Sequence, residues 1–286
     1  MSRVIDFRVR PPRGSYQRFV DIFTPETLEE FGFDTLVYEG SVATKRYDDF
    51  VAELDAAGVV KAVIPGRGGA FGLSVDEQEL ADIVALDPDR YLAFPIVDAV
   101  ADDAAEQVSH LIASGLATGV TLEPTIPVPG SATSAFDDRR AYRTYELLQA
   151  EHVPVLLTYS AHALERIDSR TAQQLDRVAA DFPDLTIVVA HAGWPWTLEC
   201  IAVAWHRPNV YLAPDVYATG GPGAEDYKAA ARTILEDKMI FNSAYPGSPV
   251  NQAVELVRRT WGLDDEALDK LLYANAARVL GLEVGD

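Results

Sequence analysis

The stretch LTIVVAHAGWPWTLECIAVAWHRPNVYLAPDV, residues 185–216, holds one strand–helix–strand unit and indicates the fold. Its two apolar runs have the length of buried strands, and the periodic segment between them is typical of a helix. Apolar runs of this kind recur along the chain, at residues 3–9, 59–66, 91–97, 119–124, 153–159, 185–193, 210–216 and 239–244. Strands that are apolar on both faces and alternate with helices predict a parallel sheet covered by helices.

Eight such runs favour a closed (β/α)8 TIM barrel, a parallel eight-stranded α/β barrel, over an open doubly wound sheet. The 286 residues suffice, because such a barrel needs about 250. No composition break or linker divides the chain, so one domain over residues 1–286 is expected. Residues 11–47 form a long insertion after the first strand, which we expect to cover the mouth of the barrel as a lid.

Composition excludes several classes of partner. The net charge of −20 and the pI near 4.5 argue against nucleic acid and anionic membranes, which bind basic faces. No apolar segment approaches the roughly 18 residues of a membrane span. The first residues lack an export signal, and the single Cys200 fits a reducing compartment, so a cytoplasmic location is expected.

The glycine-rich stretch PGRGGAFG, residues 65–72, has neither dinucleotide-binding nor P-loop spacing, so we expect no nucleotide cofactor. Catalytic groups of such barrels lie at the carboxyl ends of the strands. Those positions are rich in polar and aromatic side chains, namely Arg8, Arg10, Arg67, Glu123, Thr158, Tyr159, His191, Trp194, Asp215, Asn242 and Tyr245.

Arg8 and Arg10 are two residues apart on a strand, so their side chains point to the same side. If that side is the barrel interior, the two guanidinium groups need anionic partners, because unpaired buried charge is costly. These partners are either Glu123 and Asp215, as an internal salt-bridge network, or a carboxylate or phosphate of a ligand. Both alternatives stay open, since a ligand can displace part of such a network.

His191 ends an apolar run and is followed by two tryptophans, which favours a role in proton transfer or ligand binding over a structural role. The remaining histidines lie in helices or after strands without evident partners, and we interpret them as surface or structural residues: His110, His152, His162 and His206.

The chain resembles the amidohydrolase superfamily, in particular the amidohydrolase-related group with aminocarboxymuconate semialdehyde decarboxylase-like and resorcylate decarboxylase-like enzymes. The resemblance covers most of the length, and its most specific parts are HAGWPW through RPNVYL, within residues 191–212, and YANAARVLGL, residues 273–282. It implies a (β/α)8 barrel that usually holds a divalent metal through His-x-His on the first strand, a fifth-strand histidine and an eighth-strand aspartate. A sixth-strand histidine acts as acid or base.

This sequence departs from that ligand set. His-x-His corresponds to Arg8-Val9-Arg10, the fifth-strand histidine to Thr158, and the eighth-strand aspartate to Ala244, whereas the sixth-strand histidine is kept as His191. Arginine and alanine offer no donor that would hold zinc, and neither does an isolated threonine. We therefore expect no metal of the family type, and two arginine charges where the cation would have been.

Three hypotheses follow. The first is a metal-independent hydrolase or carbon–carbon lyase, such as a decarboxylase, for a small carboxylate-bearing substrate. In it Arg8 and Arg10, with Arg67, bind the anion, and His191 transfers the proton with Glu123 or Asp215 as partner. The second is a metal-dependent hydrolase whose ligands are His191, Asp215 and Glu123. The third is a non-catalytic ligand-binding relative. A homodimer is possible by analogy with relatives.

Overall fold

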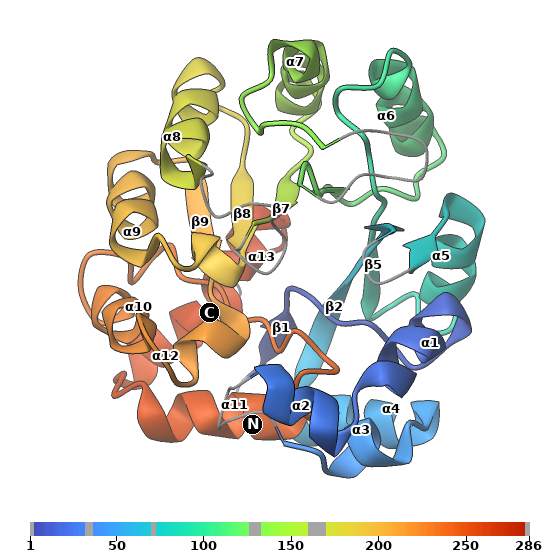
Figure 1. Cartoon of the computed structure of the whole chain (residues 1–286), viewed down its shortest axis with the longest axis vertical. Helices are drawn as coiled ribbons and strands as arrows, with labels where there is room; N and C mark the ends of the chain where they lie inside the picture. Colours follow the sequence, from blue (N-terminus) through green and yellow to red (C-terminus); the bar gives the residue numbers. More distant parts are fainter. Residues whose placement is uncertain (1–2, 32–36, 70–72, 126–132, 160–169, 284–286) are drawn as a thin grey trace.

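The computed structural model describes residues 3–31, 37–69, 73–125, 133–159 and 170–283. The strands stand at the centre of the molecule and the helices surround them (Figure 1). Neighbouring strands pair in parallel within two groups, ordered β1-β2-β5 and β6-β7-β8-β9. Their bounds are β1 Val4–Asp6, β2 Val59–Pro65, β5 Tyr91–Phe94, β6 Val120–Leu122, β7 Val155–Thr158, β8 Ile187–Ala190 and β9 Val210–Ala213.

Backbone hydrogen bonds join the two groups into a closed barrel. Residues 239–243 lie between β9 and β1, because Ile240 N donates to the Leu212 carbonyl at 2.9 Å and Phe7 N donates to the Phe241 carbonyl at 3.1 Å. On the opposite side, Thr121 N of β6 donates to the carbonyl of Pro95, just after β5, at 2.8 Å. The eighth apolar run thus completes the ring, and the expected (β/α)8 barrel is confirmed.

The helices occupy the segments between the strands and pack around the barrel (Figure 1). Their bounds are α1 Gly14–Ile22, α2 Pro25–Phe31, α3 Gly40–Thr44, α4 Tyr47–Ala57, α5 Glu77–Val84, α6 Ala104–Ala113, α7 Tyr142–Ala150, α8 Thr171–Asp181, α9 Thr197–His206, α10 Ala224–Ala231, α11 Val250–Thr260, α12 Asp265–Asp269 and α13 Asn275–Val279. In the described part of the chain, no helix has both the length and the apolar character that a membrane crossing requires.

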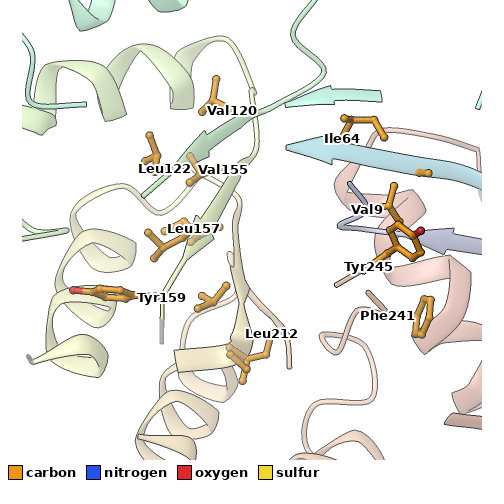
Figure 2. Packing of buried hydrophobic residues seen from close by; sticks show 14 of the residues in the cluster. Val9, Ile64, Val120, Leu122, Val155, Leu157, Tyr159, Leu212, Phe241 and Tyr245 are labelled. Carbon is orange, nitrogen blue, oxygen red and sulfur yellow. The ribbon is translucent and has the colours of Figure 1, made fainter. Parts of the chain in front are cut away.

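Side chains of each strand alternate between two apolar layers. Ile187 and Val189 of β8 belong to the layer between strands and helices, whereas Val188 and Ala190 belong to the layer inside the barrel. Figure 2 shows residues of the outer layer, including Leu157 of β7 and Leu212 of β9. This alternation leaves the inward positions at the strand ends for the side chains of the site.

The insertion after β1 folds into α1, α2 and α3. Residues 32–36, between α2 and α3 in the sequence, lie outside the described part. Tyr16 and Phe19 of α1 are buried, and the Tyr16 hydroxyl donates to the Pro65 carbonyl at the end of β2. Helix α1 therefore packs at the carboxyl-terminal rim of the barrel, where the insertion was expected. Its action as a lid stays a prediction.

The glycine-rich stretch at residues 65–72 begins a short antiparallel hairpin of β3, Arg67–Gly68, and β4, Ser74–Val75, with residues 70–72 outside the described part. The hairpin places Arg67 beside the other strand ends, and a backbone N–H of β3 donates a hydrogen bond to Glu123.

Candidate active site

Three turns at the carboxyl ends of the strands share an unusual backbone conformation. His191 after β8 has a φ of 62°, Asp215 after β9 a φ of 45°, and Ala244 after residues 239–243 a φ of 50°. Residues other than glycine rarely adopt such left-handed angles, which cost about 1 to 3 kcal/mol each and concentrate at functional sites. The three turns aim their residues over the barrel mouth and mark it as the candidate site.

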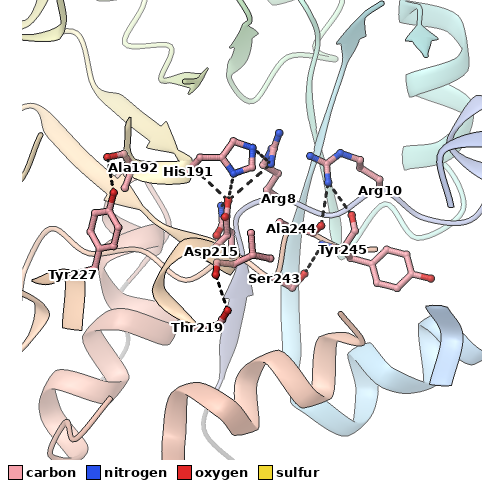
Figure 3. Close-up of polar contacts among 12 residues, drawn as sticks. Arg8, Arg10, His191, Ala192, Asp215, Thr219, Tyr227, Ser243, Ala244 and Tyr245 are labelled. Atoms are coloured by element: carbon pink, nitrogen blue, oxygen red, sulfur yellow. Dashed lines mark hydrogen bonds and ion pairs between the residues drawn. The ribbon is translucent and has the colours of Figure 1, made fainter. Parts of the chain in front are cut away.

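Arg8, His191 and Asp215 form a contact chain across the mouth (Figure 3). His191 Nδ1 lies 2.8 Å from Asp215 Oδ2, and His191 Nε2 lies 3.0 Å from Arg8 Nη1. The Arg8 and Asp215 side chains, 2% and 0% exposed, are themselves 3.9 Å apart at the nearest nitrogen and oxygen. The structure thus brings together three residues from β1, β8 and β9 that the sequence had nominated separately.

The contacts fix the tautomer of His191. A guanidinium can only donate, so the Nε2 atom that faces Arg8 must carry a lone pair and the ring proton must be on Nδ1, toward Asp215. Burial, together with the nearby Arg8 charge, lowers the pKa of His191 to about 4 despite the opposing effect of Asp215. At neutral pH the ring is therefore uncharged, and Nε2 is the atom able to accept a proton.

Asp215 is held by several donors through one oxygen. Its Oδ2 accepts from the His191 backbone N–H at 3.3 Å and from Asn242 Nδ2 at 3.4 Å. Oδ1 of Asp215 is buried and has no hydrogen-bond partner among the described residues. Asn242, nominated as a substrate-binding residue, instead lies behind the carboxylate and orients it.

Arg10 has a different environment from Arg8. Its Nη1 donates to the carbonyls of Ala244 at 3.2 Å and Tyr245 at 2.9 Å, and its guanidinium lies 5.1 Å from the ring centre of Phe19. Burial and the charges of Arg8 and Arg67 lower its pKa well below the ordinary value. Among the described residues, no carboxylate lies within ion-pair distance of Arg10.

Arg67 and Glu123 form a buried ion pair, with Arg67 Nη1 2.6 Å from Glu123 Oε1. The Gly68 backbone N–H donates to Glu123 Oε2 at 3.4 Å, which anchors the carboxylate to β3. Sequence reasoning had placed Glu123 beside His191 as a possible proton-transfer partner. That expectation is wrong for this structure, because Asp215 is the carboxylate that contacts the imidazole and Glu123 neutralises Arg67.

Asp6 supports the site from below. Its Oδ1 accepts from the backbone N–H groups of Arg8 at 3.2 Å and Ser243 at 3.0 Å, so it ties the end of β1 to the loop that closes the barrel. Burial raises its pKa to about 6. This aspartate was visible at the first strand end but was not among the nominated site residues.

Two nominated tyrosines lie in the outer layer. The Tyr159 hydroxyl donates to Gln174 of α8 and its ring packs near Phe136, on the helix side of the barrel (Figure 2). The Tyr245 ring packs on Phe50 of α4 with ring centres 4.6 Å apart. Neither phenol reaches the mouth, so their expected substrate contacts are corrected: Tyr245 contributes only its main-chain carbonyl, and alternation along the strand turns Tyr159 outward.

Thr158 and Trp194 remain close to the mouth. Thr158 ends β7 with its buried Oγ1 lacking a hydrogen-bond partner in the described part of the chain. Trp194 stacks on Tyr217 with ring centres 5.0 Å apart, and Tyr217 meets the His191 ring edge-on at 5.3 Å. Trp194 and Tyr217 thus form an aromatic contact beside His191.

Sequence reasoning did not nominate Tyr16 and Phe19, which α1 places against Arg67 and Arg10. The available signal was the aromatic content of the insertion. Of the other histidines, His110 pairs with Glu77 at the surface with a distance of 3.2 Å, in agreement with its interpretation, and His162 lies outside the described residues.

The residues at the mouth do not fit a divalent metal. Arg8, Arg10 and Ala244 offer no metal donor, and both ring nitrogens of His191 face other side chains. Within the described ranges, no group of three His, Cys, Asp or Glu side chains is arranged to hold an ion. The alternative ligand set of His191, Asp215 and Glu123 fails for the same reason, since Glu123 is held by Arg67.

Comparison with known proteins agrees with the fold. A solved structure of an uncharacterized TIM-barrel protein from Bordetella bronchiseptica is 32% identical, covers 98% of both chains and has a TM-score of 0.87. A 5-carboxyvanillate decarboxylase from Sphingomonas paucimobilis is 17% identical, covering 99% of this chain and 100% of its own, with a TM-score of 0.62. A dihydroxybenzoic acid decarboxylase from Polaromonas, solved with bound manganese and the inhibitor 2-nitroresorcinol, is 15% identical over 98% of this chain and 97% of its own, with a TM-score of 0.69.

No curated protein matches the sequence. The model of a protein family described as amidohydrolase, however, matches residues 6–282, which include the strands from β2 to β9 and all of the site residues above. With the barrel closed and the site at its carboxyl-terminal mouth, we conclude that this chain belongs to the amidohydrolase family.

Proposed function

We propose that the protein is a metal-independent hydrolase or carbon–carbon lyase that acts on a small anionic substrate by proton transfer at His191. The observation that carries this proposal is the chain Asp215–His191–Arg8, in which a neutral imidazole is held between a carboxylate and a guanidinium. Proton transfer by a positioned histidine typically contributes 10²- to 10⁴-fold to a rate.

The roles follow from the contacts. Nε2 of His191 accepts a proton from the substrate or from a water molecule, after the substrate replaces the Arg8 donor at this atom. Asp215, 2.8 Å from Nδ1, stabilises the imidazolium that forms. Arg10 stabilises the negative charge that remains on the substrate. Decarboxylation and lactone opening both begin from an anion held beside a proton-transfer group.

The lack of a suitable donor set among the described residues supports the metal-independent form of the proposal. A guanidinium does not lower the pKa of water to about 7 as zinc does. Hydrolysis therefore requires His191 itself to activate the water. Decarboxylation requires His191 Nε2 first to accept a proton, for example from a hydroxyl group of the substrate, and then to deliver that proton to the carbon that loses carbon dioxide. The decarboxylases of similar fold make carboxylate-bearing substrates the first class to test.

The experiment has two arms. Elemental analysis of protein purified without added metal is expected to find metal far below one equivalent. A panel of hydroxylated benzoates and lactones, assayed with a chelator present, is expected to include a substrate whose turnover falls about 10²- to 10⁴-fold in His191→Asn. Stoichiometric, tightly bound metal, or activity only after metal is added, contradicts the proposal. Anion binding without turnover of any member supports a non-catalytic relative instead.

A further inference from the structure

Three arginines are buried at the mouth, and they are not equivalent. Arg8 lies beside Asp215 and Arg67 beside Glu123, at nearest nitrogen–oxygen distances of 3.9 and 2.6 Å. Arg10 is as buried as the other two, with 3% exposure, and within the described part of the chain it has only main-chain carbonyls and an aromatic ring as partners. Carbonyl dipoles do not neutralise a full charge.

Asp6 is not an ion-pair partner of Arg10. Its Oδ1 is used by the backbone N–H groups of Arg8 and Ser243, and it forms no ion pair with Arg10 at 4 Å or less. Among the described residues, the mouth therefore contains one guanidinium without a carboxylate at ion-pair distance, next to two that have one. A buried cation in this situation is strongly destabilised unless an anion binds.

The position of Arg10 also suits a ligand. Its guanidinium reaches toward that of Arg8 over Ala244, while Arg8 contacts His191 on its other side (Figure 3). An anion on Arg10 would therefore hold the rest of a small molecule beside His191 Nε2. The Phe19 ring of α1 lies against the guanidinium and limits the space around it.

We propose that the arginine pair is divided in function: Arg10 is the anchor for a single negative charge of the ligand, such as one carboxylate, while Arg8 is a positioning residue that holds His191 in its reactive tautomer. This inference rests on the proposed function and sharpens it. It predicts a preference for monoanionic ligands, and it assigns a part of substrate selection to the insertion that carries Phe19.

The test uses benzoate and its neutral analogue benzamide as probes, because the two molecules share one planar ring and differ in charge. Binding is measured by calorimetry and thermal shift with the full chain. Wild type is expected to bind benzoate and not benzamide. Arg10→Gln keeps an N–H donor for the two carbonyls and is expected to weaken the binding of benzoate at least about tenfold. Without ligand, the melting temperature of this variant is expected to be no lower than that of wild type.

One charge-neutral double variant is the matched control. Arg67→Gln/Glu123→Gln removes a buried ion pair and leaves the charge of Arg10 in place. It is expected to keep benzoate affinity within about threefold. In single Arg8→Gln, ¹⁵N NMR of the imidazole is expected to show loss of the uniform Nδ1–H tautomer of His191, which Arg10→Gln preserves.

Several results would overturn the inference. These are no benzoate binding in wild type, wild-type affinity in Arg10→Gln, or an equal loss in the double variant. Each leaves the metal content unaffected, so a failure of the anion anchor is distinguished from a failure of the metal-independent mechanism, which elemental analysis and turnover decide.

Discussion

The floor and the mouth of the barrel are equally buried but chemically opposite. Phe7 and Arg8 are adjacent in the chain, with exposures of 0% and 2%, yet Phe7 packs on Phe94 in the apolar interior and Arg8 contacts His191. The floor consists of aliphatic and aromatic side chains, including Ile5, Phe7, Val63, Phe94, Leu156, Val188 and Ile240. The comparison teaches that burial alone does not identify a core.

The two regions contribute oppositely to stability. Floor residues stabilise the fold by removing apolar surface from water, whereas each mouth charge loses its hydration and recovers only part of it from its partner. The left-handed residues His191, Asp215 and Ala244 add backbone strain at the same end. The rest of the barrel has to compensate for the stability lost through these buried charges and strained residues. Because the mouth keeps them at this cost, we regard it as functional.

The largest effect is expected at the floor. Phe7→Ala removes a fully buried ring from its edge-on contact with Phe94, at 5.6 Å between ring centres, and should lower the free energy of unfolding by about 3 to 5 kcal/mol. Chemical denaturation measures the loss. Leu86→Ala, at a side chain that is 49% exposed, is the control and should change stability by less than about 1 kcal/mol. Similar losses in both variants would contradict the assignment of the floor.

Breaking a matched pair in the mouth should cost somewhat less. Arg67→Gln leaves Glu123 buried without its ion-pair partner and should lower the free energy of unfolding by about 3 kcal/mol. Adding Glu123→Gln should recover most of that loss, because the second substitution removes the unpaired charge. A double variant as unstable as the single one would show that the pair stabilises by packing and not by charge.

The free energy of unfolding should depend on pH through the shifted pKa of His191. Its pKa is lowered from 6.5 to about 4, so between these pH values the unfolded chain binds more protons and stability rises with pH. Asp6, with its pKa raised to about 6, contributes with the opposite sign between pH 3.8 and 6, because there the folded chain binds more protons. The two effects oppose each other in wild type.

Comparison with His191→Gln isolates the histidine, since the Asp6 contribution is common to both proteins. From pH 6.5 down to 4, wild type should lose about 2 kcal/mol relative to the variant, less than the full linkage value because the ring is 16% exposed. Denaturant unfolding at several pH values measures the difference. A difference that does not change with pH would show that the imidazole is not held neutral.

The smallest effect concerns two buried threonines on neighbouring strands. Thr121 Oγ1 donates to the Phe94 carbonyl at 2.8 Å, whereas Thr158 Oγ1 has no partner among the described residues. Thr121→Val should therefore lower the free energy of unfolding by about 1 kcal/mol, and Thr158→Val should raise it by a similar amount. Equal losses in both would indicate that Thr158 has a polar partner, such as bound water or a ligand.

The floor and the barrel were predictable from the sequence because they depend on local pattern. Eight apolar runs with helical segments between them permit few arrangements other than the closed barrel. The eighth run, residues 239–244, lies where the barrel requires it, between β9 and β1, and its backbone forms hydrogen bonds with both neighbours. The positions of Arg8, His191 and Asp215 at the mouth followed from the same rule, that the carboxyl ends of parallel strands meet at one end of a barrel.

The wrong expectations concerned side-chain contacts, which the pattern of strands and helices in the sequence does not specify. Tyr159 is one residue beyond Thr158, and the alternation of side chains sends its phenol outward to Gln174. Glu123 is at a strand end as expected, but the β3–β4 hairpin brings Arg67 to it, so it is not available to His191. A strand-end rule gives the end of the barrel where a residue lies, and it does not give the neighbour that the residue binds.

The sequence by itself determined the alternation of strands and helices, the (β/α)8 barrel and the set of residues at its mouth, because hydrophobic period and strand order are properties of the chain. Only the tertiary structure decided how the charges at the mouth are matched. Pairing depends on distances of a few ångströms between strands far apart in sequence. In the part of the chain that the structure describes, these distances leave Arg8 and Arg67 with carboxylates and Arg10 with main-chain carbonyls.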